Sequence, residues 1–245
     1  MFLKACLNGA RSPVEHPALP VTPEALARDA AAVAAAGAAA VHLHVKDAGG
    51  ADTLDGAALA VVLTAVREAA PGLPIGVTTG AWAAGDSNER VGLIRRWPVL
   101  PVFASVNWHE PGAEEVAGTL LARGVEVEAG LWHREAVEAW LGSPYRHRCC
   151  RVLLELPDGL DPAATAVEAD LLLTAVAAGD DTVPVLLHGE GSSCWPALRH
   201  AVDRGLATRI GLEDTLELPD GSPAADNLAL VQAALHLLRR DSPLR

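Results

Sequence analysis

Short, β-branched apolar runs alternate with longer runs rich in alanine and leucine along the whole chain. The short runs have the length of buried strands, and the longer runs between them indicate helices. The pattern predicts eight strands, over 2–7, 38–45, 74–79, 102–107, 125–130, 150–156, 184–189 and 208–214. Since a helix follows each strand, eight units share 245 residues, or about 31 residues each, which suits parallel βαβ units.

The first predicted helix carries clear signals at both ends. Thr22 is suited to cap it, Pro23 occupies its first position, and Gly37 ends it. Continuous apolar strands between helices indicate a parallel sheet that helices cover. Eight such units predict an α/β protein with a single (β/α)8 TIM barrel over residues 1–245. An open doubly wound sheet is the alternative, but LNGARS after the first strand has no G-x-G-x-x-G motif.

Composition and charge limit which partners and which cell compartment such a barrel is expected to have. Half of the residues are hydrophobic, which is enough for a large core, and the formal net charge of −12 opposes binding to nucleic acid. No apolar run is expected to reach the ~18 residues of a membrane span, and no signal peptide is apparent. Four cysteines without C-x-x-C spacing suit reduced thiols, so we expect a cytoplasmic protein.

Polar residues gather where the predicted strands end, which in a (β/α)8 barrel is where the chemistry is built. A purely structural barrel has little reason to place ionisable groups at most of its strand ends, so the crowding favours a functional site. The residues concerned are Asn8, Arg11, His42, His44, Lys46, Thr78, Thr79, Ser105, Asn107, His109, Glu126, Glu128, Glu155, His188, Glu190, Arg209, Glu213 and Asp214.

The sharpest element is the pair His42 and His44. Side chains alternate along a strand, so these imidazoles share one face about 6–7 Å apart and can reach one metal ion. The alternative is that both histidines only make hydrogen bonds within the core. That explanation suits one buried histidine better than two on the same face. Glu213, from the last strand, is the expected third ligand. Two histidines and a carboxylate are known for catalytic zinc, although iron or manganese would also suit them.

Arg209 and Asp214 on the last strand allow two interpretations of equal weight. They form either a structural ion pair or a base, Asp214, that Arg209 orients to take a carbon-bound proton near the metal. His188 is a fourth ligand, a hydrogen-bonding acid, or a satisfied core residue. Lys4 and Lys46 are the only lysines, and Lys46 lies too near the proposed ligands to suit a Schiff-base aldolase.

Several blocks resemble one enzyme family over nearly the whole chain. They are LNGARSPVEHPALPVTPEALARDAAAVAAAGAAAVHLHVKDAGG, VTTGAW, ASVNWHEPG, VEVEAGLW and TRIGLEDTLELPDGSPAADNLALV. The chain is similar to the β-keto acid cleavage enzymes. The P-x-T-P…AGA…H-x-H and R-x-G-x-E-D blocks are the most specific parts, and their occurrence in this order strengthens the match.

The resemblance implies a zinc-dependent barrel that transfers an acyl group between a β-keto acid and acetyl-CoA, giving acetoacetate and a new acyl-CoA. It places His42, His44 and Glu213 on the metal, and it assigns Arg209 and Asp214 to deprotonation of the keto acid. It also implies a homo-oligomer, expected to be a tetramer. The substrate-binding positions are Thr78 and Ser105 for the substrate's carboxylate, together with Asn107, Glu128 and Arg11.

One departure from the family bears on the substrate. After the first strand, the aminohexanoate-cleaving members have an acidic residue that suits an ammonium group, whereas this chain has Arg11, with Glu15 close by. We therefore expect a neutral or anionic substrate tail. Arg11, Arg90 and Arg95 are candidate contacts for the phosphates of CoA.

Other functions are weaker alternatives. A metal-dependent hydrolase of the amidohydrolase type would place the H-x-H pair on the first strand and a lysine on the fourth, and this sequence has neither. A metal-assisted lyase or aldolase would act on a keto acid without CoA. A non-catalytic barrel that binds a metal or a thioester does not explain the complete set of five polar residues.

Overall fold

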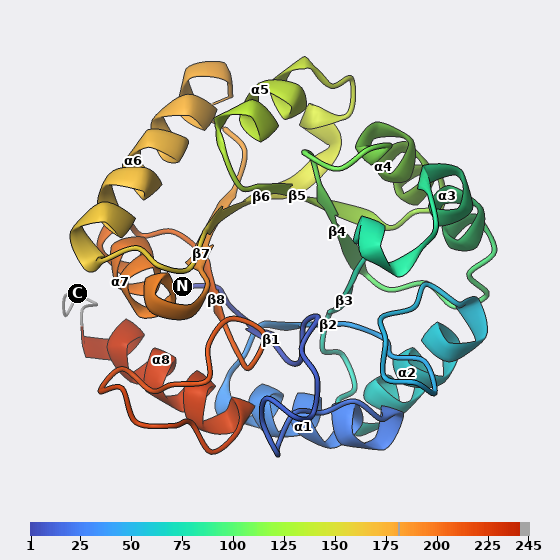
Figure 1. Ribbon diagram of the computed structural model, residues 1–245, viewed down its shortest axis with the longest axis horizontal. Helices are drawn as coiled ribbons and strands as arrows, with labels where there is room; N and C mark the ends of the chain where they lie inside the picture. Colours follow the sequence, from blue (N-terminus) through green and yellow to red (C-terminus); the bar gives the residue numbers. More distant parts are fainter. Residues whose placement is uncertain (181, 241–245) are drawn as a thin grey trace.

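The computed structural model describes residues 1–180 and 182–240, which form a ring of parallel strands inside a ring of helices (Figure 1). The strands are β1 Leu3–Cys6, β2 Ala40–Leu43, β3 Ile75–Thr78, β4 Phe103–Asn107, β5 Glu126–Leu131, β6 Cys149–Leu156, β7 Val185–Gly189 and β8 Thr208–Ile210. The α-helices are α1 Pro23–Ala36, α2 Gly56–Ala69, α3 Ser87–Arg95, α4 Ala113–Ala122, α5 Arg134–Gly142, α6 Pro162–Gly179, α7 Cys194–Arg204 and α8 Asn227–Arg240. Short 3-10 turns are η1 Ala81–Ala83, η2 Arg146–Arg148 and η3 Gly191–Ser193.

The sheet closes into a barrel. Its strands pair in the order β7-β6-β5-β4-β3-β2-β1-β8, and all seven ladders are parallel. The remaining gap between β7 and β8 is joined by a parallel bridge from Leu186 to Ala207 and by the Thr208 hydroxyl, which donates to the Leu187 carbonyl at 2.8 Å. The predicted (β/α)8 fold is therefore confirmed, and the open doubly wound alternative is wrong.

The end signals of α1 act as the sequence predicts. The Thr22 side chain accepts a hydrogen bond from the Ala25 amide, and Pro23 stands in the first turn. Gly37 adopts a left-handed conformation with φ of 117°, and its N–H reaches the carbonyls of Val33 and Ala34. A residue with a side chain is strained in that conformation, so glycine ends the helix here.

β8 is shorter than its apolar run predicts, ending at Ile210 rather than at residue 214. The chain turns at Gly211, where a Cβ atom would lie 1.9 Å from the Cys6 carbonyl oxygen. The amides of Asp214 and Thr215 both donate to the Gly211 carbonyl, which closes the turn. Glu213 therefore stands in a tight turn after the strand.

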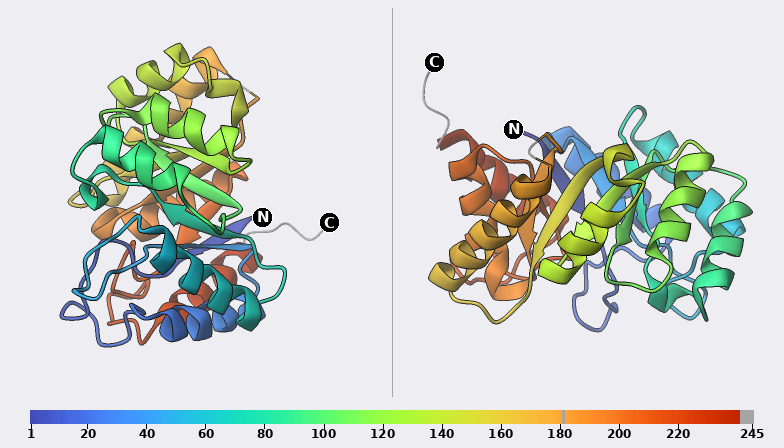
Figure 2. Two further views of the ribbon diagram at one scale, coloured as in Figure 1. Left: turned by 90° about the vertical axis from the view of Figure 1, so that its right-hand side faces the viewer. Right: turned by 90° about the horizontal axis from the view of Figure 1, so that it is seen from above.

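One helix contradicts the expectation that no segment is long enough for a membrane span. α6 has 18 residues and is apolar enough to cross a bilayer by length and composition alone. It lies on the outside of the barrel between α5 and α7 (Figures 1 and 2) and buries Thr165, Ala169, Leu172 and Val176. Helices in a protein's packed layers pass the same test, so α6 is weak evidence for a membrane protein.

Candidate active site

A cavity of about 410 Å³ opens at the carboxyl ends of the strands. This volume suits a small organic ligand. Eight of the ten predicted site residues line it, namely Arg11, His42, His44, Thr78, Ser105, Asn107, Arg209 and Glu213. The other two, Glu128 and Asp214, are fully buried outside its lining. The structure thus brings together side chains from strands far apart in the sequence.

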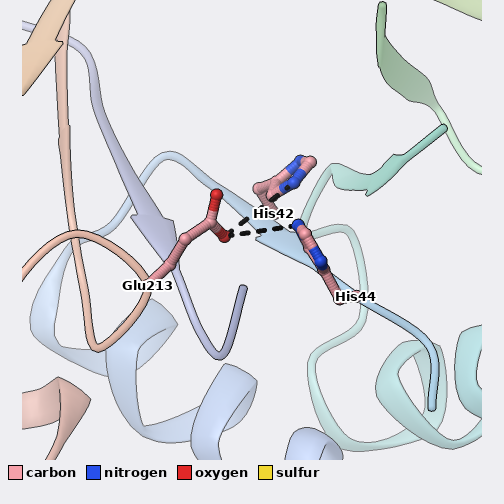
Figure 3. A group of neighbouring side chains, drawn as sticks. All are labelled: His42, His44 and Glu213. Atoms are coloured by element: carbon pink, nitrogen blue, oxygen red, sulfur yellow. Dashed lines mark ion pairs between the residues drawn. The ribbon is translucent and has the colours of Figure 1, made fainter. Parts of the chain in front are cut away.

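His42, His44 and Glu213 point toward one another at the cavity wall (Figure 3). Glu213 Oε2 lies 3.9 Å from the Nε2 atoms of both histidines. Around a tetrahedral Zn²⁺ with ligand bonds of about 2.0–2.1 Å, neighbouring ligand atoms lie about 3.3 Å apart. The three side chains therefore need only small shifts to hold one ion. They are the one such group among the described residues.

The electrostatics of the group also fit a divalent cation. Burial lowers the pKa of His42 well below its usual value, which leaves a neutral imidazole with a free lone pair. Burial alone would raise the pKa of Glu213, but charged neighbours, above all the Arg209 guanidinium, lower it to about 2, which keeps the carboxylate charged. Within the described part of the chain, no donor reaches the buried Glu213 Oε2. An orphaned buried carboxylate oxygen is costly unless a cation completes its contacts.

Backbone contacts position the ligands. His44 lies just past the end of β2, where the Asn8 side chain replaces a neighbouring strand: its Oδ1 accepts from the His44 amide at 2.8 Å, and its Nδ2 donates to the His44 carbonyl at 2.9 Å. This pairing keeps His44 extended, so it shares a face with His42. Gly9 leaves room for Glu213, since a Cβ there would lie 2.6 Å from Glu213 Cγ.

Arg209 and Asp214 form a buried ion pair beside the metal-ligand group. Arg209 Nη2 lies 2.7 Å from Asp214 Oδ1 and 3.2 Å from Glu213 Oε1. Burial raises the pKa of Asp214 to about 7, against the lowering effect of Arg209. Asp214 Oδ2 accepts no hydrogen bond within the described chain, whereas Arg209 lines the cavity. This geometry fits both interpretations of the pair, the structural ion pair and the oriented base.

His188 does not join the metal-ligand group. It is buried, with Nε2 3.4 Å from Glu155 Oε2 and Nδ1 3.9 Å from Asp214 Oδ1. The fourth-ligand interpretation is therefore wrong. Burial also raises the pKa of Glu155 well above its usual value, with Arg209 opposing and Glu190 adding to the effect. Glu155 and Glu190 both line the cavity and bring two further carboxyl groups to it.

Glu128 differs from the expectation that it contacts substrate. Its Oε2 lies 2.5 Å from Lys4 Nζ, its Oε1 lies 3.2 Å from Arg151 Nε, and it is wholly inaccessible. The pleat of β5 directs this carboxylate into the barrel interior rather than the cavity. Glu128 is the anionic centre of a buried ion triad.

The remaining predicted residues also line the cavity. Thr78 and Ser105 are register partners on β3 and β4. The Asn107 side chain donates through Nδ2 to Glu110 Oε1 at 2.9 Å, and its Oδ1 accepts from Trp132 Nε1 at 3.3 Å. Arg11 and Glu15 form an ion pair at 3.0 Å, and both line the cavity.

Among the candidate contacts for CoA phosphates, Arg90 is ruled out by burial. It is 1% exposed and is occupied by Glu110 and by the carbonyls of Thr79 and Pro111. Its role is to hold the loops after β3 and β4.

Asp52 is the residue that the sequence analysis missed. It is buried beside His44, whose Nδ1 lies 2.8 Å from Asp52 Oδ2. Its position eight residues after an H-x-H motif was the only signal in the sequence, and an acidic residue at that spacing is not distinctive without the fold.

The fold and the site define a (β/α)8-barrel enzyme with a candidate metal centre at the mouth of the barrel. Residues 1–241 match the family described as beta-keto acid cleavage enzyme, and the chain belongs to this family. Two relatives are named 3-keto-5-aminohexanoate cleavage enzyme. The one from Acetoanaerobium sticklandii is 22% identical, covering 98% of this chain and 92% of its own. The one from Fusobacterium nucleatum subsp. nucleatum is 24% identical, covering 98% and 91%.

Solved structures share the fold. ObcA in a binary complex with oxaloacetate superposes with a TM-score of 0.72 at 17% identity, over 91% of this chain and 64% of that one. ObcA in a ternary complex with a C4-CoA adduct and oxalate superposes with a TM-score of 0.71 at 18% identity, over 91% of this chain and 64% of that one. Type I 3-dehydroquinate dehydratase from Clostridium difficile superposes with a TM-score of 0.65 at 10% identity, over 98% of this chain and 91% of that one. The chain thus spans less than two thirds of ObcA.

Proposed function

We propose that this enzyme is a zinc-dependent acyltransferase that converts a β-keto acid and acetyl-CoA into acetoacetate and a new acyl-CoA. The observation that carries the proposal is the group of His42, His44 and Glu213 at the cavity wall, with an orphaned carboxylate oxygen. Membership of the β-keto acid cleavage enzymes supports the reaction class. The ObcA complex with a C4-CoA adduct supports a thioester co-substrate on a related barrel.

The reaction balances without a redox partner. Loss of a C2 proton from the keto acid gives a carbon nucleophile, which forms a bond to the acetyl carbonyl of acetyl-CoA. The CoA thiolate that the acetyl group releases then adds to the original ketone carbon, and the bond between that carbon and C2 breaks. C1 and C2 of the keto acid leave in acetoacetate, while the rest of the substrate leaves as its CoA thioester. The proton removed from C2 at the start returns to the carbanion that the cleavage leaves at the same carbon, so acetoacetate is released with no net gain or loss of protons.

The chain's own groups suit these demands. When bound, Zn²⁺ supplies a Lewis acid for the ketone oxygen. Asp214 would take the C2 proton through its unbonded Oδ2, while Arg209 holds Oδ1 at 2.7 Å. Thr78 and Ser105, paired in register on the wall, would hold the substrate's carboxylate. Asn107 lies beyond them on β4 and would contact the same substrate.

The substrate tail would meet the rim of the cavity. Arg11 led us to expect a neutral or anionic tail, but its guanidinium lies 3.0 Å from Glu15 and donates to the Glu213 carbonyl at 3.3 Å. Both signs of charge are therefore present, and a substrate panel has to include acidic, neutral and basic tails. From the cysteine pattern we also propose a cytoplasmic protein, and from the family resemblance a homo-oligomer, with a tetramer as the expected state.

The test is an assay by mass spectrometry for acetoacetate and a new acyl-CoA, with zinc-loaded protein and a panel of β-keto acids. We expect both products in equal amounts, and only when acetyl-CoA is present. Turnover that continues without acetyl-CoA would instead identify a lyase or aldolase. Activity that survives complete chelation of metal would overturn the zinc-dependent reaction.

A variant pair sharpens the assay. Glu213→Gln removes the charge of the third ligand, so zinc binding and product formation should both fall sharply. Asp170→Asn is the control. It alters a carboxylate that pairs with His200 and Arg204 on the outer helices, so zinc binding and product formation should both remain normal.

A further inference from the structure

Asp52 makes three polar contacts at the edge of the metal-ligand group, two hydrogen bonds and one ion pair. Its Oδ2 lies 2.8 Å from His44 Nδ1 and 2.7 Å from Trp82 Nε1, and its Oδ1 lies 2.6 Å from Lys46 Nζ. The Asp52 side chain is 3% exposed. The Lys46 ammonium and the Trp82 indole N–H can only donate, and between them they contact both carboxylate oxygens, so Asp52 is placed to act as a carboxylate that accepts.

A small hairpin brings Asp52 back to His44. The Thr53 amide donates to the Val45 carbonyl and the Asp47 amide to the Ala51 carbonyl, with a left-handed Gly50 in the turn. Lys46 and Asp52 face each other in an antiparallel bridge. Lys46 also donates to the Gly9 carbonyl, which ties the hairpin to the loop after β1.

The hydrogen bond to Asp52 decides which ring nitrogen of His44 is free. Because a carboxylate only accepts, the proton of the neutral imidazole must stand on Nδ1. Nε2 then carries the lone pair, and it is Nε2 that lies 3.9 Å from Glu213 Oε2. His42 has no such partner, since its buried Nδ1 makes no hydrogen bond within the described chain.

Trp82 covers this hydrogen bond from the cavity side. Its indole ring lies nearly parallel to the His44 ring, at 22° with centroids 6.1 Å apart, and its N–H shares the same carboxylate oxygen. Trp82 as a whole is 53% exposed, and it lines the cavity. An indole that reaches into solvent is thus anchored by the carboxylate that orients His44.

We propose that Asp52 is a positioning residue that holds His44 in the Nδ1–H tautomer for metal binding through Nε2, and that Trp82 supports this contact. The inference rests on the proposed metal site but assigns a residue outside its three ligands. A carboxylate behind a histidine ligand fixes the ring and increases its basicity, and its loss usually weakens metal binding about 10–100-fold.

The first test needs no metal and no variant at Asp52. Long-range ¹H–¹⁵N spectra of the metal-free protein, with the His44 signals assigned through His44→Gln, should show the Nδ1–H tautomer. A predominant Nε2–H tautomer of His44 would overturn the proposal, whatever the reaction that the enzyme catalyses.

The second test measures zinc affinity by competition with a chromophoric chelator. Asp52→Asn and Asp52→Ala should bind zinc about 10–100-fold more weakly, and Asp52→Glu should recover part of the loss. Trp82→Phe, which keeps a ring but loses the N–H donor, should lose less than Asp52→Asn. Asp170→Asn is the matched control, because Asp170 also lies 2.8 Å from a histidine nitrogen, that of His200, but far from the cavity.

The outcomes separate the two proposals. Wild-type affinity in folded Asp52→Asn and Asp52→Ala, with zinc still requiring His42 and His44, overturns the role of Asp52. Zinc affinity that is insensitive to His42→Ala and His44→Ala overturns the metal site itself, and with it the proposed function.

Discussion

Lys4 and Glu128 meet inside the barrel, with Nζ 2.5 Å from Oε2 and neither side chain exposed. Lys4 lies on β1 and Glu128 on β5, strands separated by three others in the sheet order. Arg151 on β6 adds a second cation 3.2 Å from Oε1. The barrel interior therefore contains an ionic layer that links opposite walls.

This layer predicts a stability defect for Glu128→Gln. Removing the carboxylate charge leaves the buried Lys4 ammonium without a counter-ion, which should lower the free energy of unfolding by about 3–5 kcal/mol. Urea unfolding measures the loss. Glu138→Gln, from the exposed pair with Arg134, should cause no measurable change. A raised KM for Glu128→Gln with normal stability would instead favour the contact with substrate that the family resemblance implies.

Gly211 predicts a link between backbone packing and metal binding. In Gly211→Ala the new Cβ would lie 1.9 Å from the Cys6 carbonyl, so the turn that carries Glu213 must shift. We expect a loss of roughly 1–3 kcal/mol in stability together with weaker zinc binding. Thermal unfolding and chelator competition measure the two effects. Gly92→Ala on α3 is the control, because its Cβ would meet only Arg96 Nη1 at 3.4 Å and alanine favours a helix.

Asp29 predicts a pH-dependent stability. Burial raises its pKa to about 6, against the hydrogen bond that Asn227 donates to it. Between about pH 4 and 6 the native protein holds a proton that the unfolded chain has released. The free energy of unfolding therefore falls as the pH rises through this range, and the loss persists above it.

Asp29→Asn removes this titration while it keeps an oxygen for the Asn227 contact. The variant should be more stable than the wild type at pH 7.5, by on the order of 1 kcal/mol after allowance for partial exposure, and the difference should vanish near pH 4. Chemical unfolding at several pH values measures it. A difference that is the same at every pH would contradict the assignment.

Asp214 predicts a defect in proton transfer. Asp214→Asn should slow exchange of the C2 protons of the keto acid with D₂O about 10²–10⁴-fold, because a general base contributes about that much. NMR follows this exchange without acetyl-CoA. Zinc affinity should change little, since Asp214 is not among the metal-ligand group. Wild-type exchange in a folded, zinc-loaded variant would identify Asp214 as a purely structural partner of Arg209.

Much of the site was predictable because strand period and topology place residues without contact information. His42 and His44 share a face by alternation, and every strand of a (β/α)8 barrel ends at the same rim. Glu213 was therefore predictable as their neighbour, although it stands in a turn after Ile210 rather than on β8. The ends of α1 were predictable for another local reason: a threonine side chain can accept from the first free amides of a helix, and glycine tolerates the left-handed conformation that ends one.

The sequence by itself determined the alternation of strands and helices, the barrel, and the side chains at its rim, because these follow from local periodicity and the geometry of parallel strands. Only the tertiary structure decided that Glu128 faces Lys4 rather than the cavity, and that Asp52 lies against His44. Side-chain partners across a barrel depend on tilt, register and loop path, and a single strand's pattern contains no information about these.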